Sequence, residues 1–307
     1  MTTVLSNQAQ GVQEASAPLL LEEASAEQVR AGLRARGAVL LRRAGGRSLA
    51  EFESLADELM TPLVHHAVAG MEREPVSADG ATATVNKGRG SIPLHRELSY
   101  APGAPDLLMF LCQTPPTSGG QTILCDGVVL FEALDEATRD FLRTGELVWR
   151  WEVSPARWRS ALGVTTQEEA LTAVEAINGL SRDGGSLSGA FEGATFKGAY
   201  RTGFVTRPGD GLREAFCNSV LVTVPVGDPA QERVSDANNT ATLGDGSAFP
   251  DLLLRDIAAR AEAVTYDMAW QAGDIVVLDN TRYLHGRRSI LDTERRILTR
   301  VGHSRRP

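Results

Sequence analysis

The sequence has few cysteines, no long apolar run and no excess of basic residues. Its three cysteines, Cys112, Cys125 and Cys217, are too few and too scattered for a disulfide framework or a thiolate metal site, so we expect small buried side chains. No segment approaches the roughly 20 apolar residues that span a bilayer. Residues 1–17 contain no Lys or Arg and do not resemble a secretory signal. These absences predict a cytoplasmic protein with no membrane segment.

The chain is acidic overall, with 39 acidic against 31 basic residues and a formal charge of −8. This balance argues against a nucleic-acid partner, since such proteins are usually basic. The segment 282–307 is the exception, because it holds eight arginines against Asp292 and Glu294, a local balance of +6. An anionic ligand is one explanation for this excess. The sequence carries no signal for a particular oligomeric state.

Several common catalytic motifs are also absent. No P-loop, no GxGxxG fingerprint, no HExxH and no CxxC occurs in the sequence. The stretch 185–189 has Leu187 at the centre, where a GxSxG nucleophile elbow requires serine. Phosphate-cradling, dinucleotide-binding and serine-hydrolase chemistry of the familiar kinds are therefore not indicated.

The remaining pattern predicts a mainly β protein with flanking helices. Short apolar runs alternate with Gly/Pro clusters between residues 61 and 130, which favours a β-sandwich or barrel-like core. We expect residues 1–17 to be flexible and 18–307 to form a single domain. The Gly/Ser-rich segment 181–198 is interpreted as a mobile flap over a site or as a long connection.

The candidate site begins with the histidines, of which there are five. In the HxE tripeptide, His95 and Glu97 lie two residues apart, so on an extended backbone they point the same way. With one more imidazole they would give two histidines and a carboxylate, which leave three positions open on an octahedral ion and suit ferrous iron. An isolated HxE is common by chance, so the rest of the chain has to support it.

The second imidazole is expected from His285, which follows a strongly apolar strand near the C-terminus. In the strand predicted over 295–301, residues 296, 298 and 300 share one face. Two arginines on such a face require anions, and a guanidinium pairs bidentately with a carboxylate. A dicarboxylate cosubstrate would meet that requirement.

Taken together, these stretches resemble the taurine dioxygenase/TfdA family of Fe(II)- and 2-oxoglutarate-dependent oxygenases. The resemblance runs from about Gly37 to Gly302 and is strongest at 92–100, at 115–122 and from 273 to 298. It is closest to the SyrP-like branch found in secondary metabolism, including antibiotic biosynthesis. The resemblance implies a double-stranded β-helix (jelly-roll) core with Fe(II), 2-oxoglutarate and O2 as cofactor and cosubstrates.

The resemblance also implies roles for individual residues. It makes His95, Glu97 and His285 the iron ligands and therefore the catalytic centre. It places Thr122 on a carboxylate of 2-oxoglutarate and Arg296 on the distal carboxylate. Arg300 matches a position that binds the substrate's anionic group in taurine dioxygenase. The glutamate ligand argues against halogenases, which replace it with a small residue.

Four further residues near these motifs are candidates for substrate contact: His66, Asn86, Ser99 and Tyr100. Packing in the core is an equally good interpretation for Tyr100, and His65–His66 also fits a surface role.

The expected activity is hydroxylation, desaturation or epoxidation of a small amino-acid-like metabolite, with release of succinate and CO2. The substrate is either free or tethered to a carrier protein, which the arginine pairs 287–288 and 305–306 would contact. Two alternatives remain open, a zinc-dependent hydrolase built on the same three ligands and a non-catalytic binding protein. Zinc gives no reason for Thr122 and Arg296, and a complete triad argues against simple binding.

Overall fold

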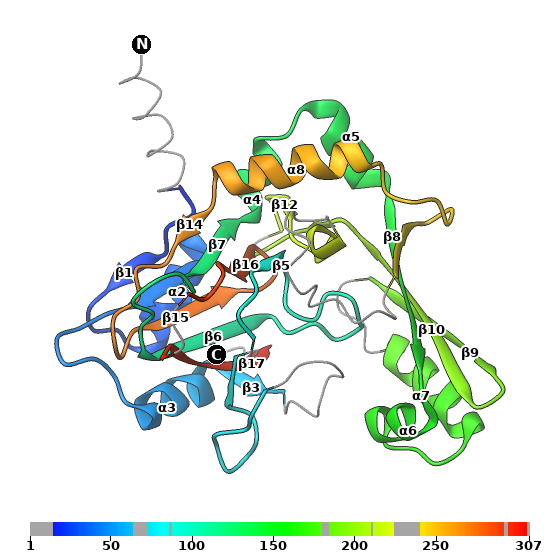
Figure 1. The fold of residues 1–307 in the computed structure, drawn as a ribbon, viewed down its shortest axis with the longest axis horizontal. Helices are drawn as coiled ribbons and strands as arrows, with labels where there is room; N and C mark the ends of the chain where they lie inside the picture. The colour runs from blue at the N-terminus through cyan, green and yellow to red at the C-terminus, as the bar shows by residue number, and fades with distance from the viewer. Residues whose placement is uncertain are drawn as a thin grey trace.

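A computed structural model describes residues 15–63, 73–85, 88–179, 184–209, 211–223, 240–291 and 294–305. Two of its sheets face each other (Figure 1). The large sheet has the order β1-β2-β15-β6-β17-β3, and β4 also pairs with β17. Its strands are β1 (Leu19–Leu21), β2 (Ala38–Leu41), β3 (Met60–Pro62), β4 (Ala83–Thr84), β6 (Leu107–Thr114), β15 (Ile275–Asp279) and β17 (Arg296–Ser304).

The small sheet has the order β14-β7-β16-β5 and lies against one face of the large sheet. Its strands are β5 (Ile92–His95), β7 (Thr122–Asp126), β14 (Tyr266–Asp267) and β16 (Tyr283–Arg287). Apolar side chains from both sheets fill the space between them, including Phe110, Leu124 and Ile297. This pair of sheets is the jelly-roll core that the sequence predicts.

A third sheet extends away from the core, on the right of Figure 1. It has the order β13-β8-β10-β9 and carries two helices at its far end. These elements are β8 (Glu146–Val153), β9 (Ser186–Glu192), β10 (Thr195–Gly203), β13 (Thr240–Leu243), α6 (Pro155–Leu162) and α7 (Gln167–Gly179). A short pair, β11 (Val205–Thr206) with β12 (Ala215–Phe216), and a 3-10 turn over Val220–Thr223 lead back toward the core.

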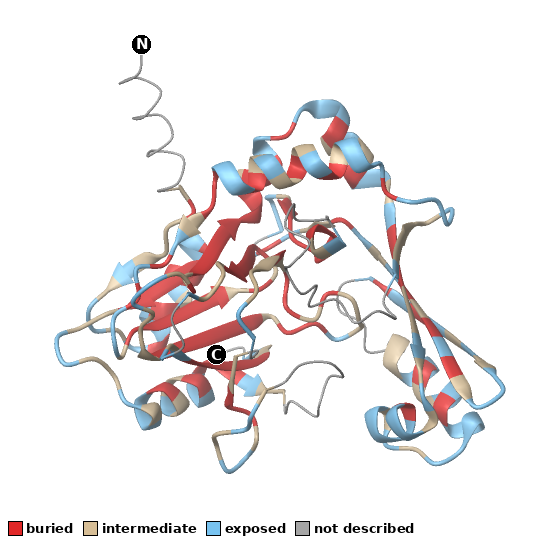
Figure 2. Cartoon of the chain, in the orientation of Figure 1, coloured by how far each residue is buried: buried red, intermediate tan, exposed pale blue. Residues whose placement is uncertain are grey.

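Helices cover the outer faces of the two core sheets (Figure 2). The outer face of the large sheet packs against α2 (Ala26–Arg36) and α3 (Leu49–Leu59). The outer face of the small sheet packs against α4 (Gly127–Glu132) and α8 (Asp251–Ala263), and α5 (Glu136–Thr144) lies nearby. Among the described helices, none is long and apolar enough to cross a membrane.

The local signals in the sequence explain where these helices begin and end. Ser25 and Ser48 each form a capping box with the residue three positions later. Gly37 ends α2 in the left-handed region, at a φ of 74°. Residues 1–14, most of the segment expected to be flexible, lie outside the described part of the chain. Ser16 is buried, and its hydroxyl accepts a hydrogen bond from the backbone of Asp126.

The Gly/Ser-rich segment is a regular hairpin in its described part, 184–198, and not a lid over the core. Strands β9 and β10 pair in continuous register, with Gly189 opposite Gly198. A Cβ atom at Gly189 would lie 2.2 Å from the ring of Phe196, and one at Gly198 would lie 2.8 Å from Trp151. These glycines are therefore required because aromatic rings lie over the backbone. Residues 181–183 lie outside the described part of the chain.

Candidate active site

The two candidate histidines come from neighbouring strands of the small sheet. In the register of β16 and β5, His285 lies directly opposite His95, and their ring centroids are 4.2 Å apart. Tyr283 and His285 have the same phase along β16, so the imidazole of His285 faces the large sheet, where it contacts the ring of Phe110. The site therefore lies between the two sheets.

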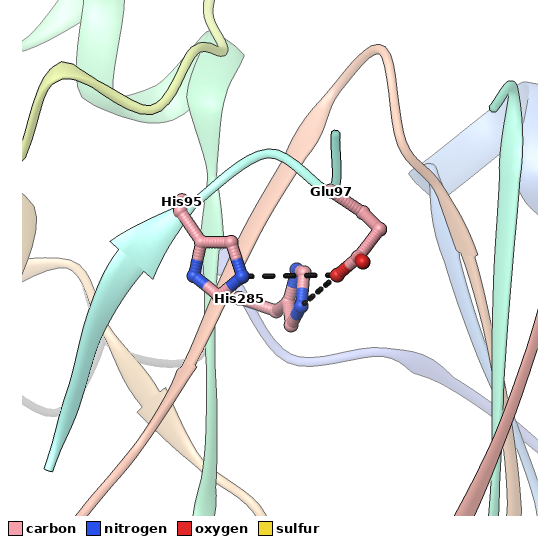
Figure 3. A group of neighbouring side chains, drawn as sticks. All are labelled: His95, Glu97 and His285. Atoms are coloured by element: carbon pink, nitrogen blue, oxygen red, sulfur yellow. Dashed lines mark ion pairs between the residues drawn. The ribbon is translucent and has the colours of Figure 1, made fainter. Parts of the chain in front are cut away.

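Glu97 joins the two histidines from the turn that follows β5 (Figure 3). Its Oε2 lies 3.4 Å from Nε2 of His285 and 3.8 Å from Nε2 of His95. The ligand atoms of the three residues lie within 4.8 Å of one another. Oε2 is buried and has no hydrogen-bond partner among the described residues. An unpartnered carboxylate oxygen between two imidazole nitrogens fits a divalent metal ion, so the residues present suit ferrous iron.

The protonation states also suit a metal. Burial, together with the neighbouring His95, lowers the pKa of His285 to about 4, which keeps its imidazole neutral. Burial alone would raise the pKa of Glu97, but the charge of Arg73 and the two neighbouring imidazoles hold it well below its usual range. Nδ1 of His95 lies 2.9 Å from the carbonyl oxygen of Pro93, which leaves Nε2 for a ligand bond. The set therefore offers an anionic carboxylate and the neutral imidazole of His285, with Nε2 of His95 as the third donor atom.

Two residues that hold Glu97 were not identified from the sequence. The side chain of Asn280 accepts a hydrogen bond from the backbone N–H of Glu97 at 3.0 Å and donates one to its carbonyl at 3.1 Å. Arg73 donates a hydrogen bond to Oε1 of Glu97 at 3.0 Å. Neither residue belongs to a recognisable motif, and Asn280 lies 183 positions from its partner. The proximity of Asn280 to His285 in sequence is the one signal that pointed toward the site.

A second polar group lies at the start of β7. Trp270 Nε1 and Arg295 Nη2 both donate hydrogen bonds to the hydroxyl oxygen of Thr122, at 3.1 and 3.3 Å. Burial, together with the charge of Arg287, lowers the pKa of the Arg295 guanidinium to about 10. Nε of Arg295 is buried without a hydrogen-bond partner in the described structure. This end of the site therefore brings positive charge next to a hydroxyl group.

The arginine at Thr122 differs by one residue from the sequence prediction. Arg296 was expected there, but its side chain is exposed, and its neighbour Arg295 makes the contact. The physical reason is the local backbone, because β17 begins at Arg296, whose side chain is exposed, and its pairing with β6 shifts register between Arg296 and Ile297. Arg295 precedes the strand, and its side chain reaches Thr122.

Arg300 also lies away from the predicted place. It is buried, but on the outer face of the large sheet, where Leu298 packs with the residues of α3. Its Nη2 pairs with Asp57 at 2.7 Å and with Asp79 at 2.9 Å. Arg300 therefore cannot contact a substrate between the sheets, and its anionic partners are carboxylates of this chain.

The other candidates for substrate contact have varied placements. The hydroxyl of Ser99 is buried and lies 2.6 Å from that of Ser219, so it takes part in an internal hydrogen-bond network. Tyr100 is half-buried and packs edge-on against Trp149. His66 and Asn86 lie outside the described residues.

Much of the basic C-terminal segment is used within the fold. Arg282 forms a buried ion pair with Asp126 at 2.6 Å. Arg288 pairs with both Glu262 and Asp267. Arg287 is buried and donates hydrogen bonds to the backbone carbonyls of residues 88 and 90. The pair 287–288 is thus engaged within the chain and is not a free surface for an acidic carrier protein.

Comparisons with known proteins agree with this architecture. The family model for taurine catabolism dioxygenase TauD, TfdA family, matches residues 5–301. A clavaminate synthase-like protein of Arabidopsis thaliana is 23% identical over 281 residues, which cover 85% of this chain and 80% of that protein.

Two solved structures illustrate the shared fold. A taurine dioxygenase from Burkholderia xenovorans is 16% identical with a TM-score of 0.56, covering 94% of this chain and 87% of that one. PvcB, an Fe, alpha-ketoglutarate dependent oxygenase from an isonitrile synthetic pathway of Pseudomonas aeruginosa, is 15% identical with a TM-score of 0.51, covering 93% and 82%. The match to the family model over nearly the whole chain, joined to the His-Glu-His site, favours oxygenase chemistry over a zinc hydrolase or a binding protein. The chain belongs to the TauD/TfdA family and is a 2-oxoglutarate-dependent non-haem iron dioxygenase.

Proposed function

We propose that the protein hydroxylates an unactivated carbon of a small, amino-acid-like metabolite. In this proposal His95, Glu97 and His285 hold Fe(II), and Thr122 and Arg295 hold the distal carboxylate of 2-oxoglutarate. The observation that carries the proposal is the unpartnered Oε2 of Glu97 between two imidazoles, with the half-buried Arg295, just before β17 of the large sheet, next to Thr122 of the small sheet. With iron bound, the site supplies oxygen chemistry that couples decarboxylation of 2-oxoglutarate, to succinate and CO2, with oxidation of a substrate C–H bond.

The hydroxyl of Thr122 supports the place of the cosubstrate. A hydroxyl group has two acceptor lone pairs and one proton to donate. Trp270 and Arg295 occupy both lone pairs, so the proton is left to donate to a carboxylate. A dianion beside Arg295 would also offset the repulsion that Arg295 experiences from Arg287.

The spacing along β7 suits a short dicarboxylate. His285 lies opposite Leu124 in the sheet, and Thr122 is two residues further along that strand. Two residues of extended chain span about 7 Å. A five-carbon diacid bridges a distance of this order, with one end at the metal ligands and the other at Thr122.

The stretch 92–100 resembles the SyrP-like branch, and the similar PvcB acts in an isonitrile synthetic pathway, so we place the reaction in cytoplasmic secondary metabolism, such as antibiotic biosynthesis. Glu97 supports hydroxylation over halogenation. A free metabolite is favoured over a carrier-tethered one, because Arg288 is already paired with Glu262 and Asp267.

Anaerobic absorption spectroscopy tests the cosubstrate site. We expect a weak visible charge-transfer band when 2-oxoglutarate is added to the Fe(II)-loaded protein. The matched control is 2-oxobutyrate, which lacks the distal carboxylate and should need a much higher concentration to form the band. Bound iron without any band would refute the proposed cosubstrate site.

Substrate class is tested by release of succinate. Purified protein with Fe(II), 2-oxoglutarate and O2 is incubated with free amino acids and, in parallel, with the same amino acids loaded on carrier proteins. Succinate formed faster with free substrates supports the proposal, and formation with loaded carriers alone contradicts it. The product mass distinguishes hydroxylation, which adds one oxygen, from desaturation, which removes two hydrogens.

A further inference from the structure

We propose that Arg73 is a positioning residue that orients the Glu97 carboxylate, holding Oε1 aside so that Oε2 faces the metal site. This inference rests on the proposed metal site. Arg73 Nη2 lies 3.0 Å from Oε1 of Glu97, and the two side chains are only 10% and 1% exposed. The other oxygen, Oε2, faces the two histidines and has no hydrogen-bond partner among the described residues. The two oxygens of one carboxylate thus have different tasks.

This division decides how many positions on the metal remain open. A carboxylate that binds through one oxygen leaves three positions of an octahedron beside two histidines. A carboxylate that binds through both oxygens would leave two. Bidentate 2-oxoglutarate and O2 together would need three, so a guanidinium that holds Oε1 aside would keep the third position open.

Other contacts leave rotation of the Glu97 side chain as its main remaining freedom. Asn280 holds both the N–H and the carbonyl group of the Glu97 backbone and also donates to the carbonyl of Pro105. The next residue, Leu98, has a φ of 57°, a conformation that non-glycine residues seldom adopt. With the backbone fixed, the hydrogen bond from Arg73 sets which carboxylate oxygen faces the histidines.

Arg73 is itself held in place by the opposite sheet. The residue after it, Glu74, accepts a hydrogen bond from the backbone N–H of Thr84 and donates its own N–H to the Thr84 hydroxyl. Thr84 belongs to β4, which pairs with β17 of the large sheet. Arg73 therefore connects the large sheet to a metal ligand that follows β5 of the small sheet.

The charge of Arg73 gives the test a clear sign. At a pH where Glu97 stays ionised with or without Arg73, a cation close to the site repels a divalent metal, so if this repulsion were its only effect, neutralising Arg73 would tighten metal binding. If Arg73 positions Glu97, neutralising it weakens metal binding, because loss of a residue that orients a ligand typically costs about 10–100-fold in affinity. The two effects have opposite directions.

The experiment measures Mn(II) binding by electron paramagnetic resonance, and 2-oxoglutarate binding to the Mn(II)-loaded protein by calorimetry. We expect Arg73→Met to weaken Mn(II) binding by about tenfold and to weaken 2-oxoglutarate binding as well. Arg73→Gln is a second neutral variant with the same expected loss, in case the Met variant does not fold. Arg73→Lys keeps a charged donor and should restore most of the affinity.

Arg300→Met is the matched control, because Arg300 is also buried and paired with carboxylates but lies outside the site. It should leave both affinities unchanged. Neutral Arg73 variants that bind Mn(II) as tightly as the wild type, or more tightly, would overturn the inference, as would a lowered melting temperature with unchanged affinities. Wild-type protein that binds neither Mn(II) nor 2-oxoglutarate would instead refute the proposed function.

Discussion

Arg295 and Arg300 lie close together in the sequence, next to and within β17, and their side chains leave the large sheet on opposite faces. On the inner face, Arg295 approaches the hydroxyl of Thr122, and its Nε has no hydrogen-bond partner in the described structure. On the outer face, the Nη2 atom of Arg300 is paired with Asp57 and Asp79. Buried charge is usually matched by a partner, so an arginine with no carboxylate partner among the described residues indicates a place for an anionic ligand.

Replacing Arg295, the arginine on the inner face, should have the largest effect of the predicted substitutions. We expect Arg295→Met to weaken 2-oxoglutarate binding roughly 30-fold or more, because loss of one partner of a buried charge pair costs about 2–5 kcal/mol. Calorimetry on the Mn(II)-loaded protein under anaerobic conditions measures the change. Arg296→Met is the neighbouring control, since its side chain is exposed, and should change the affinity less than about twofold. A large loss in the Arg296 variant alone would reverse the assignment.

The outer arginine should act on stability and not on ligands. We expect Arg300→Met to lower the free energy of unfolding by about 1–2 kcal/mol, because Asp57 and Asp79 are half-exposed and regain water when their partner is lost. Urea denaturation measures this change, and binding of 2-oxoglutarate should be unaltered. If Arg300→Met had normal stability but bound 2-oxoglutarate more weakly, contacts on the outer face of the large sheet would affect the cosubstrate site, contrary to this prediction.

The sequence predicts which residues of β17 alternate along the strand, but not which face of the strand lines the site. Residues 298 and 300 do share the outer face, and Arg300 does meet anions, as such a pattern requires. The anions are Asp57 and Asp79, which come from α3 and from the segment before β4, so only the folded chain reveals them. Alternation along a strand specifies two faces but not which one lines the site.

The metal ligands could be predicted from the sequence, whereas the residues that hold Glu97 in place could not. His95 and Glu97 were found because their spacing is local, and His285 was found because its surroundings resemble a known family. Arg73 carries no such signal and Asn280 only its proximity to His285, since the two contact Glu97 from 24 and 183 positions away. The fold class followed from short strands between Gly/Pro clusters, whereas the hairpin of β9 and β10 was missed because glycines beneath aromatic rings resemble a flexible segment in the sequence.

The smallest effect concerns the hydroxyl that lies beside the inner arginine. We expect Thr122→Val to weaken 2-oxoglutarate binding about three- to tenfold, because one hydrogen bond contributes about 0.5–1.5 kcal/mol. Thr122→Ser keeps the hydroxyl and should bind within about twofold of the wild type. Calorimetry as above compares the two variants. Equal affinities would mean that Thr122 only supports Trp270 and Arg295, and that the arginine holds the carboxylate without it.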